Sequence, residues 1–386
     1  MRNRAAILAA AAGLLPALLG VLPPMVAAAA SDVPAAPAAS SALAPSEDGV
    51  FVFLTGTVAL SPSDAWAVGF GGIGGTGFLS SQVLHWNGHQ WVSVKILPGV
   101  SLDALESVSA TSPSDIWSVG LEGDNCLIEH SNGPKWATVP CPYQGLSSEL
   151  LGVDARTKSD AWAVGSLTAG NGGTSAALSE HWNGHHWAQV TVPPVSGTFV
   201  QLNSVLDLGP DNILAVGDYE NKANVEQQLA EHWNGHAWKR VSVPAFSTAS
   251  FLEGISGGTA AGVTAVGAVS SGGHDVPLIE RWTGTRFVRV TQPVSSGDLN
   301  AVTVLSRTNA YAVGNTGSSK TLVEHYNGKR WALVPTPNPA DGGYFASIAV
   351  VPSGSFAVAV GAHGPEFNQR FVIEQGNGRA WRITRD

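Results

Sequence analysis

Short apolar segments recur along the chain from Phe51 onward, and residues typical of turns separate them. In one copy of the pattern the segments are Leu202–Leu208, Ile213–Asp218, Leu229–Trp233 and Ala237–Val243. Runs of this length between Gly, Asn, Asp and Pro are typical of β-strands and too short for most helices. The pattern therefore predicts four strands in each copy, which we name A to D.

The four-segment unit occurs seven times between residues 51 and 386. Its clearest copies read SPSDAWAVG…LHWNGHQWVSV, from Ser61 to Val94, and SDAWAVG…LSEHWNGHHWAQV, from Ser159 to Val190. A spacing of about 48 residues is typical of a four-stranded propeller blade. The sequence predicts an all-β fold, a seven-bladed β-propeller with four antiparallel strands per blade. We expect the blades at about 51–100, 101–147, 148–198, 199–249, 250–296, 297–342 and 343–386.

The phasing of the repeat resembles that of kelch-type propellers, with a glycine ending strand B, an aromatic residue in strand C and Trp in strand D. The motif S-x-x-D-x-W-A-V-G followed by E-H-W-N-G-x-x-W-x-x-V is similar to repeats of uncharacterised secreted bacterial propellers. The chain departs from kelch repeats in having one glycine in place of two and His-Trp-Asn-Gly in place of the Tyr-Asp pattern. The resemblance covers about residues 51–386 and implies a fold without implying a function.

Two turns carry repeated residues. The C–D turn is Asn-Gly in six copies and Thr283-Gly284 in the other, which is a strong hairpin signal. The A–B turn has one slot filled by Asp, Asn or Gly, residues that tolerate positive φ, so we predict a left-handed or Asx-turn position there. The members of that slot are Asp64, Asp115, Asp160, Asn212, Gly262 and Asn309.

The N-terminus predicts export. Arg2 and Arg4 precede an apolar run from Ala5 to Val21, and Ala28 and Ala30 fit a small-residue cleavage pattern. We expect a signal peptide at 1–30 and a disordered Pro/Ala/Ser linker at 31–49, with an uncleaved membrane anchor as the alternative. No other segment is expected to contact a membrane.

The charge balance excludes some partners. The chain has 20 basic and 29 acidic residues, a net charge of −9, which becomes 18 − 29 = −11 after loss of Arg2 and Arg4. Nucleic acids and anionic lipids require clusters of Lys and Arg, so neither is an expected partner. A secreted protein that remains monomeric, because the ring buries its own core, is the expectation.

The thirteen Trp residues and most of the histidines have a structural explanation. Every Trp occupies a repeat slot, where we expect it to pack between blades. Five histidines share one slot of strand C, which holds Arg281 and Gln375 in two other copies. Residues spread one per blade cannot converge on one metal ion, so we expect hydrogen bonding and no metal or cofactor. The five are His85, His130, His181, His232 and His325.

The two cysteines predict a disulfide. Folding the second copy's C–D hairpin about Gly133 and Pro134 brings Cys126 opposite Cys141. In an exported protein such a pair favours a cross-strand bridge, with free thiols as the alternative.

A ligand is expected on the face formed by the B–C and D–A connections, because those segments differ between copies. The predicted function is non-enzymatic binding of an extracellular protein or glycan by this variable face. The alternatives are a lyase or hydrolase with an axial site on the same face, in which His274 or His363 of B–C loops would act, and a purely structural surface module. The candidate binding residues are Asp103, Glu122, Asp124, Tyr143, Tyr219, Glu220, His274, Asp275, Tyr344, His363 and Glu366.

Overall fold

The structure is a computed structural model that describes residues 50–73, 78–96, 102–133, 135–143, 147–168, 175–364, 369–377 and 380–385. The expected signal peptide at 1–30, the linker at 31–49 and the candidate residue Glu366 lie outside the described residues.

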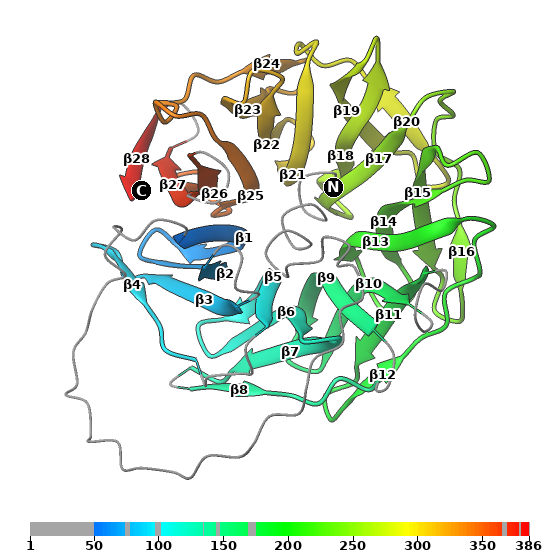
Figure 1. Cartoon of the computed structure of the whole chain (residues 1–386), viewed down its shortest axis with the longest axis horizontal. Helices are drawn as coiled ribbons and strands as arrows, with labels where there is room; N and C mark the ends of the chain where they lie inside the picture. Colours follow the sequence, from blue (N-terminus) through cyan, green and yellow to red (C-terminus); the bar gives the residue numbers. More distant parts are fainter. Residues whose placement is uncertain are drawn as a thin grey trace, which may run out of the picture.

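The described residues form seven four-stranded antiparallel sheets arranged around one axis (Figure 1). Each sheet consists of four consecutive strands, so the all-β, seven-bladed prediction is confirmed. The first three blades contain β1 (Val50–Ser61), β2 (Asp64–Ile73), β3 (Phe78–Trp86), β4 (Trp91–Ser93), β5 (Asp103–Ser112), β6 (Asp115–Glu122), β7 (Asn125–Ser131), β8 (Trp136–Thr138), β9 (Ser147–Thr157), β10 (Asp160–Thr168), β11 (Ser175–Trp182) and β12 (Trp187–Gln189).

The other four blades contain β13 (Thr198–Asp207), β14 (Ile213–Glu220), β15 (Glu226–Trp233), β16 (Trp238–Arg240), β17 (Ser250–Gly258), β18 (Gly262–Ser271), β19 (His274–Trp282), β20 (Phe287–Val290), β21 (Gly297–Ser306), β22 (Asn309–Thr316), β23 (Thr321–Tyr326), β24 (Trp331–Leu333), β25 (Tyr344–Val350), β26 (Ala357–His363), β27 (Arg370–Gly376) and β28 (Trp381–Arg385). Among all the residues that the structure describes, no helix has the length and apolar character needed to cross a bilayer.

Aromatic side chains fill the spaces between blades, as their repeat slots predict. The strand-D indoles of Trp136, Trp187 and Trp238 pack edge to face on strand-B indoles of the preceding blade, with ring centroids 5.2–5.8 Å apart. Such pairs add to the hydrophobic gain of burying each ring. None of the thirteen Trp side chains is among the exposed large hydrophobic residues. Their role is to hold neighbouring blades together.

The repeated histidine of strand C forms a hydrogen bond with the A–B turn of its own blade. His85 Nε2 lies 2.9 Å from Asp64 Oδ1, and the Trp66 indole donates to the same oxygen at 3.0 Å. The imidazole also stacks on that indole, with centroids 4.2 Å apart. The same His–Asp or His–Asn contact is present in the second, third, fourth and sixth blades, which confirms the hydrogen-bonding prediction.

The predicted left-handed backbone at this turn slot is wrong for its Asp and Asn members. Among the described residues, the non-glycine positions with positive φ are Phe199, Asn224, Ser319 and Asn338, and only Gly262 of the slot is left-handed. Asp and Asn recur here because each presents a side-chain oxygen to the imidazole. The C–D turns behave as predicted in the six blades whose turn glycine is described, since Gly88 and its counterparts there have φ between +87° and +106°.

Within the described residues, the ring closes without a strand shared between its first and last blades. The first sheet holds β1 to β4 and the last holds β25 to β28. A shared core joins them, and it includes Leu54, Trp86 and Trp91 from the first blade with Val360 and Ile373 from the last. The backbone amide of Val52 also donates to the Gln369 carbonyl at 2.9 Å.

Candidate functional site

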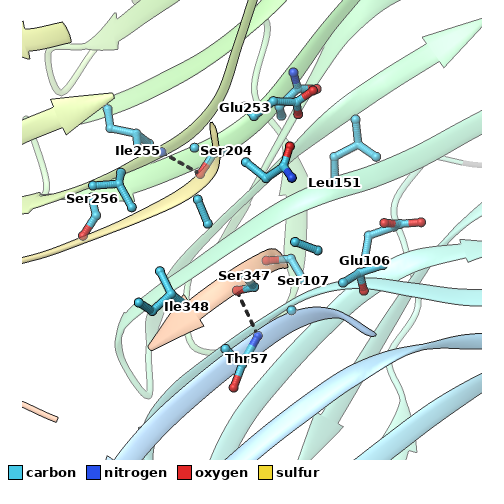
Figure 2. Close-up of a pocket in the computed structure, with 18 of the residues that line it drawn as sticks. Thr57, Glu106, Ser107, Leu151, Ser204, Glu253, Ile255, Ser256, Ser347 and Ile348 are labelled. Carbon is cyan, nitrogen blue, oxygen red and sulfur yellow. Dashed lines mark hydrogen bonds between the residues drawn. The ribbon is translucent and has the colours of Figure 1, made fainter. Parts of the chain in front are cut away.

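A cavity of about 480 Å³ runs along the ring axis, lined mainly by the innermost strand of each blade (Figure 2). These strands are β1, β5, β9, β13, β17, β21 and β25, the predicted strands A. Cavities of this size in a rigid ring hold small ligands or single side chains of a partner.

Every strand A carries a β-bulge at the same level of the cavity. In β1 the pairing jumps from Leu54 opposite Gly69 to Gly56 opposite Val68, which leaves Thr55 as the extra residue. A bulge re-aims the extra side chain, and the cavity lining includes this residue from each blade. The seven bulge residues are Thr55, Glu106, Leu151, Asn203, Glu253, Asn300 and Ala346.

The bulge requires the repeated glycine of strand B, which is the last residue of the sequence Ala-Trp-Ala-Val-Gly in the first blade. A Cβ atom added to Gly69 would lie 2.0 Å from the Phe53 carbonyl oxygen, and one added to Gly120 would lie 1.9 Å from that of Ala104. The two strands are too close there for any side chain. The repeated glycine of strand B thus allows the bulged strand A to lie close to strand B in every copy.

Three bulge residues link their blade to the next one. Thr55 Oγ1 donates to the Leu105 carbonyl at 2.8 Å, and Asn203 Nδ2 donates to that of Leu252 at 2.9 Å. Asn300 Nδ2 makes the equivalent bond at 2.7 Å. Glu106 and Glu253 occupy the same bulge position in their blades and place carboxyl groups in the cavity lining (Figure 2).

The cavity lining is acidic. It includes six carboxyl side chains and, among the residues that the structure describes around it, no Lys, Arg or His. Four of the acids come from the fourth, fifth and sixth blades, so one side of the ring holds most of the negative charge. The six are Glu106, Asp154, Glu226, Glu253, Asp275 and Asp298.

Burial and repulsion from neighbouring carboxylates raise the pKa of two of the six acids. Burial raises the pKa of Asp298 to about 6, and the charges of Glu253 and Asp275 add to the rise, while a hydrogen bond from Asn315 opposes it. Burial likewise raises the pKa of Asp154 to about 6, although the Asp207 backbone amide stabilises its ionised form. Both carboxyl groups can exchange protons near neutral pH.

Two of the candidate residues line the cavity. Asp275 accepts a hydrogen bond of 2.6 Å from Ser270, and Tyr344 lies at the start of the last strand A. Asp275 is the candidate that the structure brings into the acidic group.

The other described candidates lie apart from the axis. Asp103 is buried and pairs in register with Glu122, whereas Asp124 and His274 are exposed. Tyr219 lies half-buried beneath the Arg240 guanidinium, whose carbon is 5.5 Å from the ring centroid. Tyr143 packs against the core of the second and third blades, and Glu220 accepts a hydrogen bond from Thr198.

The histidines predicted in loops belong to strands. His274 begins β19, and His363 ends β26 with only 6% of its surface exposed. His363 Nδ1 lies 2.8 Å from Asp341 Oδ1. Strands B and C extend into segments that we expected to form B–C loops. Between β14 and β15, for example, only residues 221–225 lie outside the strands.

Sequence reasoning missed Glu106, Asp154, Glu226, Glu253 and Asp298. The signal for two of them was present, since each strand A contains an apolar residue, a variable residue and a small residue in order, as in Leu105-Glu106-Ser107. The variable position is the bulge. No such motif marks Glu226 or Asp298, because ring closure alone brings them to the axis.

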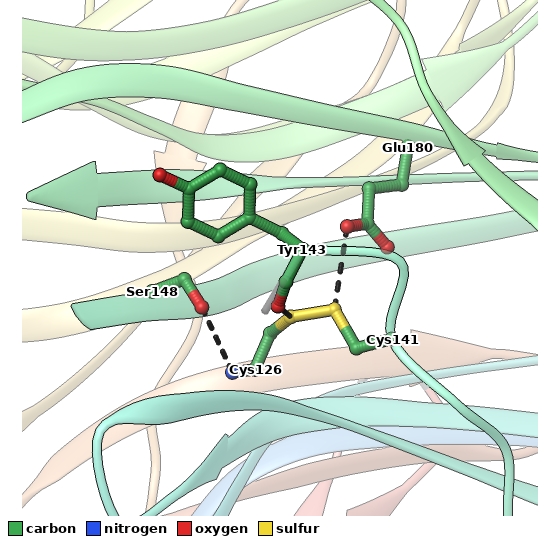
Figure 3. Close-up of a disulfide and its surroundings, with 5 residues drawn as sticks. All are labelled: Cys126, Cys141, Tyr143, Ser148 and Glu180. Atoms are coloured by element: carbon green, nitrogen blue, oxygen red, sulfur yellow. Dashed lines mark hydrogen bonds between the residues drawn. A yellow bond between two sulfur atoms is a disulfide. The ribbon is translucent and has the colours of Figure 1, made fainter. Parts of the chain in front are cut away.

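The predicted disulfide is confirmed. Cys126 and Cys141 are bonded, with Cα atoms 6.1 Å apart and a sequence separation of 15 residues. The bridge lies beside Glu180 of the next blade, whose carboxyl oxygen is 3.3 Å from Cys141 Sγ (Figure 3).

Comparison with known proteins identifies the fold and no closer relationship. No family model matches the chain, and no curated protein sequence does. The chain is similar in structure to YCF48 from Cyanidioschyzon merolae, at 16% identity and a TM-score of 0.52, over 83% of this chain and 95% of that one. It is also similar to YCF48 bound to D1 peptide, at 16% identity and a TM-score of 0.50, over 82% and 92% of the two chains.

A further structural neighbour is the PL25 ulvan lyase bound to -[GlcA(1-4)Rha3S]-, at 10% identity and a TM-score of 0.53, over 86% of this chain and 93% of that one. Identities this low show a shared β-propeller architecture and nothing about activity.

Proposed function

We propose that the protein is exported and binds an extracellular protein or glycan through the face formed by its B–C and D–A connections, centred on the axial cavity. The cavity is the single observation that carries this proposal, because a rigid ring of bulge side chains offers a preformed polar site. The kelch-like character of the repeat and cleavage after Ala30 belong to the same proposal and rest on the sequence motifs alone.

The charge of the lining narrows the ligand class. The described lining includes six carboxyl groups and no Lys, Arg or His, a composition that favours a cationic or neutral ligand and disfavours uronic-acid or sulfated chains. Among proteins of this architecture, YCF48 has been solved with a D1 peptide and ulvan lyase with -[GlcA(1-4)Rha3S]-. Both peptides and saccharides thus suit the architecture, and the acidic lining leads us to propose basic peptide segments or amino sugars.

An enzyme acting at the axis is the second candidate. Asp298, whose pKa burial raises to about 6, could donate a proton near neutral pH. A carboxyl group with a raised pKa is the kind of proton donor that hydrolases and lyases use.

Binding assays with charge-matched variants test the proposal. The secreted protein would be screened against basic and acidic peptides and against neutral, amino-sugar and uronate glycans. We expect binding to basic or amino-sugar probes, weakened about tenfold by Glu253→Gln or Asp298→Asn through loss of a charged contact. Asp211→Asn is the control, because this exposed acid lies on an A–B turn at the opposite face.

The outcomes separate the candidates. Equal binding by the wild-type protein and both cavity variants would contradict an axial ligand site. Cleavage of a bound probe that disappears in Asp298→Asn would favour the enzyme. No binding to any probe would favour a structural module.

A further inference from the structure

A second group of side chains with coordinating atoms lies between the second and third blades. Cys126, Cys141 and Glu180 are 6%, 4% and 0% exposed. Their sulfur and carboxyl oxygen atoms all lie within 4.8 Å of one another. None of the three lines the axial cavity, so this group is separate from the proposed ligand site.

The repeat geometry explains why the carboxyl group meets the cysteines. Glu180 occupies a strand-C slot whose side chain faces the preceding blade, as Glu280 shows by accepting a 2.9 Å hydrogen bond from Gln228. The slot that Gln228 fills in the fourth blade is filled by Cys126 in the second. The packing between blades would therefore bring a Glu against this position at every interface except that with the first blade, where Leu84 fills the slot. Among the described residues, only Glu180 meets sulfur there.

The surroundings hold the three groups in place (Figure 3). The Cys126 backbone amide donates to Ser148 Oγ at 3.0 Å. The Tyr143 backbone amide donates to the Glu180 carboxyl group. The Tyr143 carbonyl oxygen lies 3.8 Å from Cys126 Sγ. Both ends of the group are thus fixed by backbone contacts.

We propose that reduction of the Cys126–Cys141 bridge creates a site for a thiophilic divalent cation such as Zn²⁺, with Glu180 as the third ligand. In a tetrahedral zinc site, with Zn–S near 2.3 Å and Zn–O near 2.0 Å, sulfur and oxygen ligands lie about 3.5 Å apart. The observed distance from Cys141 Sγ to Glu180 Oε1 is 3.3 Å. The sulfur atoms must separate, and the Tyr143 carbonyl oxygen or a water molecule can complete the site.

The chemistry balances with one added reductant. A phosphine such as TCEP takes up an oxygen atom from water, and the disulfide gains two electrons and two protons to give two thiols. Binding of M²⁺ then displaces both thiol protons, because thiolates are the ligands. The metal replaces the covalent cross-link between the same two segments of the second blade.

Metal titration of the intact protein tests the site. The TCEP-reduced chain would be titrated with Co²⁺ in the absence of oxygen, and Zn²⁺ would then be used to displace it. We expect one equivalent bound, with intense visible bands of tetrahedral cobalt and a near-ultraviolet sulfur-to-cobalt charge-transfer band. The oxidised chain should give neither band.

Matched variants assign the ligands. Glu180→Gln should weaken binding at least about tenfold, since even outer-shell changes have effects of this size. Glu231→Gln, at the same repeat slot in the next blade, should bind like the wild-type protein. Blocking both thiols of the folded, reduced protein with iodoacetamide should abolish binding, and this readout does not depend on whether a double cysteine variant folds.

Two results would overturn the proposal. One is a reduced protein that binds no more cobalt than the oxidised protein. The other is equal affinity of the Glu180→Gln and Glu231→Gln proteins, which would remove the carboxyl group from the site.

Discussion

The backbone amide of Thr57, in the first blade, donates a 3.2 Å hydrogen bond to the hydroxyl of Ser347, in the last. The same contact joins neighbouring blades inside the ring, where the amide of Val153 donates to Ser107 and that of Ile255 to Ser204. The seam between the chain's two ends thus uses the contact that its internal interfaces use. Closure needs no special strand because the last interface repeats the others.

Small residues directly after the strand-A bulge, where neighbouring blades contact each other, should be essential to stability. A Cβ atom on Gly152 would lie 2.9 Å from both the Asn203 carbonyl oxygen and the Ser204 Cα atom. We expect Gly152→Ala to lower the free energy of unfolding by about 1–3 kcal/mol through overpacking. Urea denaturation measures this. Gly258→Ala is the matched control, because its nearest neighbour is 3.8 Å away, and a comparable loss there would contradict the explanation.

Asp64, in the A–B turn of the first blade, should tolerate replacement by Asn and should not tolerate replacement by Ala. Asn212 and Asn309 fill the slot of Asp64 in two other blades and accept the same bond from histidine. We expect Asp64→Asn to change the free energy of unfolding by less than about 0.5 kcal/mol. Asp64→Ala should cost about 1–2 kcal/mol, because His85 and the Trp66 indole both lose their acceptor. Equal effects of the two variants in urea denaturation would show that the contact contributes nothing.

The buried glutamates of strand C should make the ring less stable as pH rises. Burial raises the pKa of Glu324 from 4.5 to about 8. Between these values the native state holds a proton that the unfolded state has lost, so this contribution to stability is full below pH 4.5 and is lost as pH rises toward 8. The slope is at most about 1.4 kcal/mol per pH unit for one group.

Glu324→Gln isolates this effect. The variant should lose the part of the pH dependence due to Glu324, and its stability relative to the wild-type protein should increase with pH across the window. Urea denaturation at several pH values measures the difference. Asp124→Asn, which changes an exposed carboxyl group, should leave the pH dependence unchanged. Parallel pH profiles for the Glu324→Gln and wild-type proteins would contradict the predicted linkage.

Reduction of the disulfide should weaken the second blade without unfolding the ring at room temperature. Closing a loop of 15 residues contributes about 3 kcal/mol in the chain-entropy model. We expect a lower urea midpoint for the reduced protein in the presence of a chelator, with an unchanged far-ultraviolet spectrum before the transition. Identical midpoints for the two states would contradict a stabilising role.

Part of the structure followed from local patterns, and part did not. The Asn-Gly turns and the pairing of Cys126 with Cys141 depend on neighbouring segments of one hairpin, which the spacing of residues shows directly. The function of Asp64 was misjudged because its partner, His85, is 21 residues away and nothing in the turn itself indicates that contact. The acidic lining was missed for a similar reason, because Glu226 and Asp298 lie in different blades.

The sequence by itself determined the seven-fold repeat of four strands, since short apolar runs, turn residues and aromatic slots act within one blade. Only the tertiary structure decided which side chains meet at the axis and which carboxyl group lies against the disulfide. Those encounters depend on how blades are placed around the ring. That placement results from packing between segments about 50 residues apart, a distance at which no local pattern specifies a contact.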